Sequence, residues 1–172
     1  MNQQGFTFQL TGFKELTDLL AKLPTESMQK AAVRNALKKA GKPIAEAAQD
    51  NARSLPVDAE KVAKSIEVST SLKKSQRGRI DRSRVKVYIG ARSPLAHLFE
   101  FGTSDRYSKE GYYRGMLQPL PFLRPAWDAG KGVALDILRK ELWLEIQKAA
   151  RRLRKKAEKG TLTAKQREGL LR

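Results

Sequence analysis

The fold of this chain is decided by two short stretches, Ala96-His97-Leu98-Phe99-Glu100-Phe101-Gly102-Thr103 and, after a polar loop, Pro121-Phe122-Leu123-Arg124-Pro125-Ala126-Trp127. The first stretch predicts a structural corner in which Phe99 and Phe101 pack. Gly102 is expected to take a backbone conformation that other residues avoid, and Glu100 or Thr103 to satisfy backbone groups of the loop. A catalytic Glu100 would need a partner group and a pocket, and the nearby acids Asp105 and Glu110 lie in a loop with no evident fixed geometry. The structural role is therefore favoured.

The second stretch predicts the start of a long helix. Proline is favoured in the first helical turn, where its missing N–H group has no intrahelical acceptor to lose, and Pro125 is placed accordingly. The helix is expected to run from Pro125 to Lys159, with weak points at its two glycines. Phe122 and Trp127 are expected to be buried against the sheet or the leucine-rich helix.

Two earlier helices are indicated by apolar residues at helical spacing. The first is rich in leucine, begins near Phe13 and should end before Pro24. The second is rich in alanine and runs from about Glu26 to Arg53. Its Gly41-Lys42-Pro43 step predicts a kink or a break, because proline removes a backbone donor and crowds the preceding turn.

Three strands are predicted from alternation of apolar and polar residues, at residues 6–10, 66–70 and 85–89. The last two should form an antiparallel hairpin with the long basic loop 72–84 at its tip. A short turn or helix is expected at 94–101, and the polar segment 103–118 is expected to be a mobile loop.

Together these elements predict an α+β fold, with a small antiparallel sheet packed against an Ala/Leu-rich helix pair and a long C-terminal helix. Residues 1–159 are expected to form a single domain, and residues 160–172 a short extension with a terminal helix that begins near Thr163. The length of 172 residues suits one domain.

The chain is strongly basic, with 35 Lys and Arg against 18 Asp and Glu and a net charge of +17. Such a charge favours an anionic partner, which can be nucleic acid, an acidic protein surface or a membrane surface. The chain has no cysteine, so disulfides, thiolate metal sites and a cysteine nucleophile are excluded. Its first residues lack the pattern of a signal peptide, and no apolar run is long enough to span a bilayer.

The densest charge lies near the end of the long helix, where seven cations accompany only Glu158. These residues are Lys148, Arg151, Arg152, Arg154, Lys155, Lys156 and Lys159. Two interpretations stay open: a solvated helix end, and a helix that contacts phosphates or docks on an acidic surface. No aromatic residue is interleaved with the run, so stacking on bases is not implied.

Catalytic and cofactor motifs are lacking in the sequence. The single histidine, His97, has no second histidine or carboxylate cluster for a metal site and is expected to be a partly buried polar residue. There is no Walker loop, no paired-glycine dinucleotide fingerprint and no Gly-x-Ser-x-Gly elbow. We therefore expect no enzyme activity, no metal and no cofactor.

The Glu100-Phe101-Gly102-Thr103 corner followed by Pro121-Phe122-Leu123-Arg124-Pro125-Ala126 resembles the tail-completion or minor tail proteins of long-tailed, lambda-like bacteriophages, the gene-product-ten-like family. The resemblance covers roughly Phe6 to Ala150. Leu55-Pro56-Val57 and Lys64-Ser65-Ile66 also match the family's turn and the strand after it. The residues between them, 58–62, depart from the usual Thr-Gly-x-Leu step, and the basic run lies outside the signature.

The resemblance implies a structural part of the phage neck that joins the tail to the DNA-filled head as one member of a multimeric ring. Its implied partners are a tail terminator on one side, a head-closure or adaptor protein on the other, and further copies of itself. The implied location is the virion, after assembly in the host cytoplasm. A non-specific contact with double-stranded DNA is a further expectation, and a sequence-independent nucleic-acid-binding protein is the alternative function.

Overall fold

The computed structural model describes residues 14–71 and 85–170. The described elements are α1 (Lys14–Ala21), α2 (Glu26–Ala52), α3 (Ala59–Lys64), β1 (Ile66–Ser69), β2 (Tyr88–Ala91), α4 (Ala96–Phe101), α5 (Leu123–Glu158) and α6 (Ala164–Leu170). The predicted strand at 6–10 and the basic loop 72–84 lie outside the described residues. The fold is α+β, as predicted, with a small antiparallel sheet and a long C-terminal helix.

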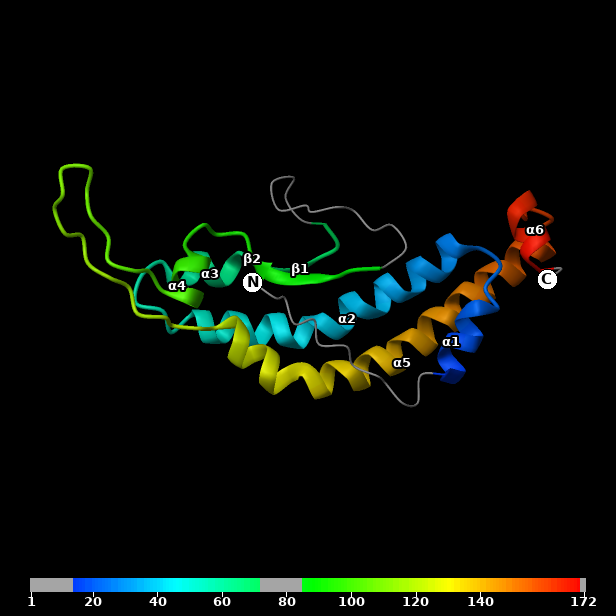
Figure 1. Ribbon diagram of the computed structural model, residues 1–172. Helices are drawn as coiled ribbons and strands as arrows, with labels where there is room; N and C mark the ends of the chain where they lie inside the picture. Colours follow the sequence, from blue (N-terminus) through cyan, green and yellow to red (C-terminus); the bar gives the residue numbers. More distant parts are fainter. Residues whose placement is uncertain (1–13, 72–84, 171–172) are drawn as a thin grey trace.

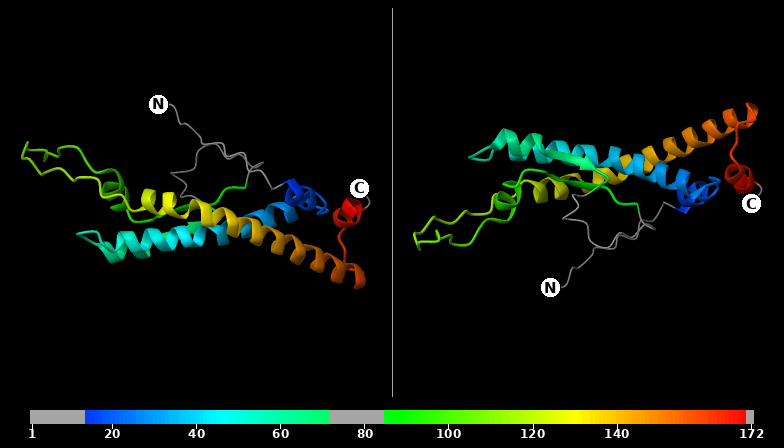
Figure 2. Two further views of the ribbon diagram at one scale, coloured as in Figure 1. Left: turned by 90° about the horizontal axis from the view of Figure 1, so that it is seen from below. Right: turned by 90° about the horizontal axis from the view of Figure 1, so that it is seen from above.

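Helix α2 is the central element of an elongated molecule. The long helix α5 runs along one side of α2, and the β1–β2 sheet lies on another (Figures 1 and 2). Buried alanines line much of α2, including Ala36, Ala48 and Ala52, each with no exposed surface. Such small side chains let both neighbours approach the helix closely, which is the packing that the alanine-rich pattern predicts.

Of the kink or break predicted at this step, the break does not occur, because the helix continues through Pro43. Gly41 is buried, and a Cβ atom there would lie 3.2 Å from Ile89 and 3.3 Å from Val68. Packing against the sheet at this step and against α5 elsewhere holds the helix together despite the hydrogen bond that Pro43 cannot make. The glycine thus serves a close approach of the sheet.

The sheet has the predicted antiparallel pairing but a shifted second strand. Ile66 pairs with Ala91 and Ser69 with Tyr88, so β2 begins three residues later than the predicted strand at 85–89. Helix α3, which the sequence analysis did not predict, precedes β1 and buries Val62 and Ala63 completely or nearly so. Because it has only six residues, α3 is too short to show helical periodicity.

The core is divided along the length of the molecule. The largest cluster joins the C-terminal half of α2 to α3, β1, α4 and the start of α5. Two smaller clusters join α1 and the N-terminal half of α2 to the second half of α5 through Leu16, Leu142 and Leu153, among others. Helix α6 returns to this end, where Leu162 before it packs against Leu153's cluster.

None of the helices in the described part of the chain is long and apolar enough to span a bilayer.

Helix α5 runs without interruption through both glycines that were expected to weaken it, and these two positions make a matched pair. A Cβ at Gly132 would meet nothing within 4 Å, whereas a Cβ at Gly130 would lie 2.9 Å from Cγ1 of the buried Ile44. Gly132→Ala should raise the free energy of unfolding by about 0.5–1 kcal/mol, because alanine is the better helix former.

Gly130→Ala should lose that gain or become destabilising, since the new methyl group pushes Ile44 out of place. Urea denaturation of the two variants measures the difference. Equal stabilisation by both changes would contradict the close contact between α2 and α5.

Candidate interaction surfaces

The carboxylate of Glu100 caps the start of α5 from outside the helix. Its Oε2 accepts hydrogen bonds from the backbone N–H groups of Phe122 and Leu123, both at 2.9 Å, and its Oε1 accepts one from Arg124 at 3.1 Å. The next residue, Pro125, has no N–H group. All the amide donors of the first turn are therefore satisfied, and a negative charge lies at the positive end of the helix dipole.

This arrangement explains why the two signature stretches occur together. Glu100 is only 4 % exposed, and the Arg124 Nε lies 4.0 Å from its carboxylate. Both carboxylate oxygens are engaged by backbone donors, so Glu100 is a structural residue in the geometry observed, as predicted. A buried carboxylate needs such compensation, because burial without partners would cost several kcal/mol.

The corner itself is built by Gly102 and Thr103. Gly102 has φ of 71°, and a Cβ there would lie 2.7 Å from the carbonyl oxygen of Leu117, so the predicted positive φ is confirmed. The Thr103 N–H donates to that same carbonyl at 2.9 Å, and the Thr103 hydroxyl accepts a bond from the Leu117 N–H at 3.0 Å. The corner therefore joins the two ends of the following segment.

The aromatic residues of the signature differ in burial. Phe122 is 1 % exposed, and Phe99 is also buried, as predicted. The prediction was wrong for Trp127, which is 49 % exposed, and for Phe101, which is 63 % exposed. Phe101 instead lies under the guanidinium of Arg124, 5.1 Å from its ring centre, which is a cation–π contact on the surface.

The other signature residues lie around this cap. Ala126 is buried one turn into α5, Leu123 is half-buried, and Pro121 is exposed.

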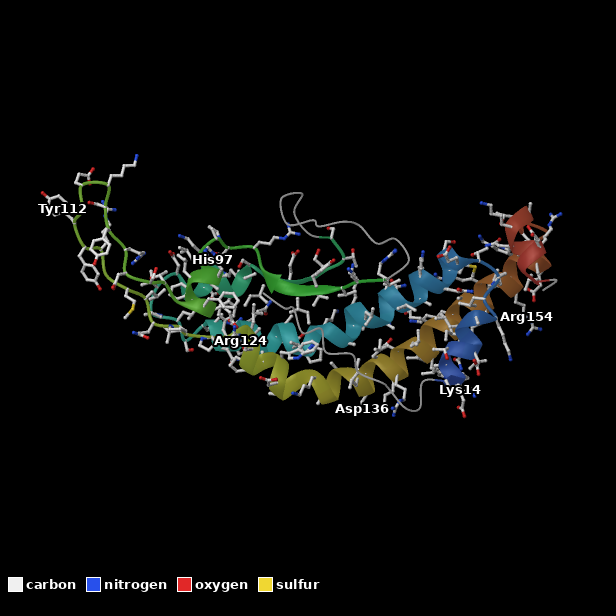
Figure 3. The ribbon with its side chains drawn as sticks, viewed as in Figure 1. Lys14, His97, Tyr112, Arg124, Asp136 and Arg154 are labelled. Carbon is white, nitrogen blue, oxygen red and sulfur yellow. The ribbon has the colours of Figure 1, made fainter. Side chains whose placement is uncertain are left out.

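The segment from Thr103 to Leu120, here called the arm, projects from one end of the molecule (Figures 1 and 3). Sequence analysis predicted a mobile loop without a fixed geometry, but the arm is a hydrogen-bonded hairpin. Arg106 donates to the Gly115 carbonyl at 3.1 Å, Ser108 donates to that of Tyr112 at 2.8 Å, and Tyr107 bridges Tyr113. Glycines with positive φ at positions 111 and 115 suit its turns.

Large apolar side chains are exposed along the arm. They are Tyr107, Tyr112, Tyr113, Met116 and Leu120, with exposed fractions from 41 % to 73 %. Figure 3 places Tyr112 at the far end of the molecule from Arg154. Residues of this kind, concentrated on one projecting element, are typical of a surface that another protein covers.

The basic helix end lies at the opposite end of the molecule. All seven cations between Lys148 and Lys159 are exposed. Arg154 pairs with Glu158 at 3.3 Å and Lys148 with Glu145 at 3.2 Å. The basic run identified in the sequence is thus an exposed group of cations at the end of α5.

A polar network joins α2 and α5 just before this basic end. Glu145 is 9 % exposed and accepts hydrogen bonds from Asn35, Lys39 and Lys148. Burial opposes ionisation of this carboxyl, but the three donors outweigh it and lower its pKa to about 2. Hydrogen bonds from Lys39 to Glu141, at 2.6 Å, and to Glu145 raise the pKa of that lysine. The network thus links α2 and α5 by hydrogen bonds between their side chains.

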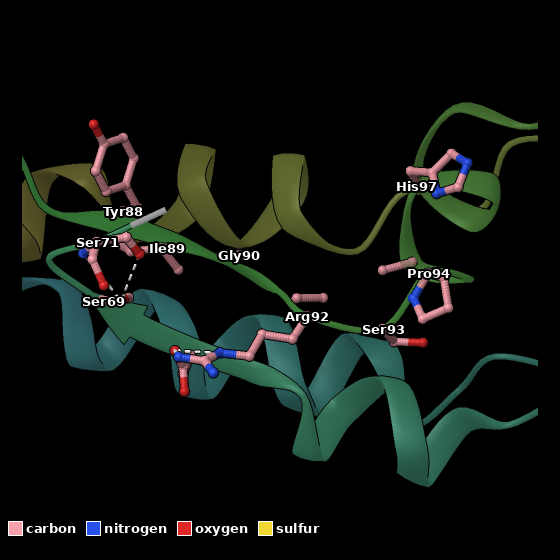
Figure 4. A pocket seen from close by; sticks show the side chains of 12 residues that line it. Ser69, Ser71, Tyr88, Ile89, Gly90, Arg92, Ser93, Pro94 and His97 are labelled. Carbon is pink, nitrogen blue, oxygen red and sulfur yellow. Dashed lines mark hydrogen bonds and ion pairs between the residues drawn. The ribbon is translucent and has the colours of Figure 1, made fainter. Parts of the chain in front are cut away.

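A groove of about 530 Å³ lies between the sheet and α4 (Figure 4). An ion pair crosses the sheet at its edge, where Arg92 Nε donates to Glu67 at 2.7 Å. His97 stands on the exposed side of α4, so the predicted partial burial of this residue was wrong. Among residues 14–71 and 85–170, no three acidic or histidine side chains are grouped as metal ligands.

Sequence reasoning missed the hairpin form of the arm and the network around Glu145. The arm lacks the alternation of apolar and polar residues that reveals a strand, although its glycines and tyrosines were visible. Glu145 is one glutamate among several on α5, and only the approach of α2 distinguishes it.

Residues 14–102 of the chain match the family described as "Bacteriophage HK97-gp10, putative tail-component". The match covers just over half of the chain and ends within the corner, so the Pro121–Ala126 stretch, the arm and the basic helix end lie beyond it. No curated protein and no solved structure matched the chain. The chain therefore belongs to the HK97-gp10-like family, and it is a structural component of a bacteriophage tail that works in the virion with other virion proteins.

Proposed function

We propose that the chain is a head–tail connector of the phage neck, a tail-completion protein that joins the tail to the DNA-filled head as one subunit of a closed ring. Its partners are further copies of itself, a tail terminator on one side and a head-closure or adaptor protein on the other. The ring assembles in the host cytoplasm. In this role the chain is not an enzyme, and it needs neither a cofactor nor a small-molecule substrate.

The arm is the observation that supports this proposal most strongly. Its five exposed apolar side chains form a surface that a neighbouring protein would cover, and tyrosine is enriched among residues that dominate binding energy. The arm projects from one end of an elongated molecule (Figure 1). In this position it can contact the surface of a neighbouring protein. Contacts between unlike surfaces generate closed rings when the rotation between subunits closes.

The family signature sets the direction of the arm. Thr103 is tied to Leu117 at the arm's base, and the Leu120 N–H donates to the carbonyl of Phe99 at 2.7 Å. Glu100 then caps α5 directly after the arm. The corner, the arm base and the start of α5 are thus one connected unit, which gives the arm a fixed point of departure from the body. We propose that residues 1–159 form the domain that enters the ring and that residues 160–172 are an extension.

Removal of exposed side chains from the arm should block assembly without unfolding the subunit. In a phage that carries Tyr112→Ala together with Met116→Ala, we expect joined particles to fall by about 100-fold or more, because two residues central to an interface contribute about 2 kcal/mol or more each. Electron microscopy of the lysate would show separate heads and tails. The purified variant should keep its thermal unfolding midpoint, because both side chains are exposed.

The matched control is Val57→Ala together with Val133→Ala, which removes two exposed apolar side chains outside the arm. It should leave joining normal. Normal particle yields from the arm variant, or an equal loss in the control, would contradict a role for the arm in assembly.

A further inference from the structure

The basic end of α5 carries cations in a regular line. At 100° per residue, Lys148, Arg152, Lys155 and Lys159 fall on one narrow face of the helix, with Arg151 and Lys156 at its two borders. Leu153 faces the core and lies well away from this line. At 1.5 Å per residue the line is about 16 Å long, which spans about five base-pair steps along the axis of a DNA duplex at 3.4 Å each.

Most of this charge is uncompensated within the described part of the chain. No acidic side chain there forms an ion pair with five of the seven cations, Arg151, Arg152, Lys155, Lys156 and Lys159. The arm at the other end is nearly balanced, with three cations against Asp105 and Glu110. Positive charge is therefore distributed unevenly over the molecule. The arm end is aromatic and nearly neutral, and the end of α5 is strongly positive (Figure 3).

We propose that this line of cations binds the phosphate backbone of double-stranded DNA without reading its sequence. The inference deepens the proposed function, since it places the positive end of each subunit against DNA at the head–tail junction. Lysine and arginine at regular spacing neutralise phosphates. The line and its borders include no asparagine or glutamine to read adenine, and a specific contact of arginine or lysine with guanine would require the helix to enter the major groove.

DNA fits this surface better than the other anionic partners. A helix that lies on a membrane buries large apolar side chains beside its cations, and none is exposed between Lys148 and Lys159. An acidic protein would have to match the spacing of the cations with its own carboxylates. A DNA duplex presents regularly spaced phosphates whatever its sequence, so the same cations can meet them at any position along the duplex.

The test compares two variants of the isolated 172-residue chain, each without four exposed cations. The line variant is Arg151→Gln, Arg152→Gln, Lys155→Gln and Lys159→Gln. The control variant is Lys38→Gln, Lys42→Gln, Lys86→Gln and Lys140→Gln, which has the same net charge but leaves the line intact. Binding to a duplex of arbitrary sequence is measured by fluorescence anisotropy between about 50 and 200 mM KCl, the range over which phosphate binding weakens steeply. Circular dichroism confirms that both variants are folded.

Each phosphate that the protein no longer neutralises should reduce the slope of log K against log salt by about 0.9. Because the line variant neutralises four fewer phosphates, its fall in affinity between about 50 and 200 mM salt should become about 100-fold smaller, while the control stays close to the unmodified protein. Equal effects of the two variants would show that the binding depends on net charge alone, and would overturn the proposal. Unchanged DNA affinity of the line variant would also overturn it and would leave an acidic protein surface as the partner. Both failures would leave the ring and the arm untouched, because the assay uses the isolated chain.

Discussion

Glu100→Ala is expected to lower the free energy of unfolding by about 3–5 kcal/mol, one of the largest effects of any single change in the described part of the chain. The substitution removes three charge-assisted hydrogen bonds to the first turn of α5 and leaves the N–H group of the buried Phe122 without an acceptor. It also removes the negative charge at the positive end of the helix dipole. Urea denaturation followed by circular dichroism measures the change.

Glu100→Gln tests the same contact more gently. Glutamine keeps the volume and one acceptor oxygen of the side chain. The free energy of unfolding of Glu100→Gln should therefore lie between that of the unmodified protein and that of Glu100→Ala. The matched control is Glu46→Ala, which removes an exposed carboxylate from α2 and should change the stability by about 0.5 kcal/mol or less. A cost below about 1 kcal/mol for Glu100→Ala would show that the carboxylate does not hold the start of α5.

Phe122→Ala is expected to cost about 3–5 kcal/mol, because the side chain is almost fully buried and alanine would leave a cavity among α2, α4 and α5. The loss should appear in thermal and urea unfolding, with the helical signal of the folded protein retained. Because Phe122 immediately precedes α5, its backbone also depends on Glu100. The two changes together should therefore cost less than the sum of their separate effects.

Trp127→Ala is the control that separates burial from side-chain size. Trp127 is larger than Phe122 and lies on the same helix start, but about half of it is exposed. Its removal should cost about 1 kcal/mol or less. A loss as large as that of Phe122→Ala would mean that Trp127 belongs to the core, as the sequence pattern alone suggested.

Local features of the chain were predictable where the residue type permits few conformations or few environments. The positive φ of Gly102, the placement of Pro125 in the first turn of α5 and the burial of Phe122 all follow from such residues. The long helices were predictable because apolar positions recur along them over many turns. The same reasoning set Glu100 apart as structural, although it did not specify the three amides that Glu100 binds.

Features that depend on neighbours were not predictable. An aromatic residue beside a corner can face the core or the surface, and the sequence pattern did not reveal that Phe101 lies outside, in contact with Arg124. The continuation of α2 through Pro43 depends on packing against the sheet and α5, which a local rule for proline does not include. The hairpin form of the arm depends on pairing between residues that are distant along the segment, such as Thr103 and Leu117.

The central claim is that several copies of this chain form a closed ring at the head–tail junction. Electron microscopy of intact virions, with reconstruction of the neck, tests it most directly. The account predicts a symmetric ring between head and tail in which the arm of each subunit, residues 103–120, lies against the next protein. A single off-axis copy in the neck, or no copy there at all, would contradict it.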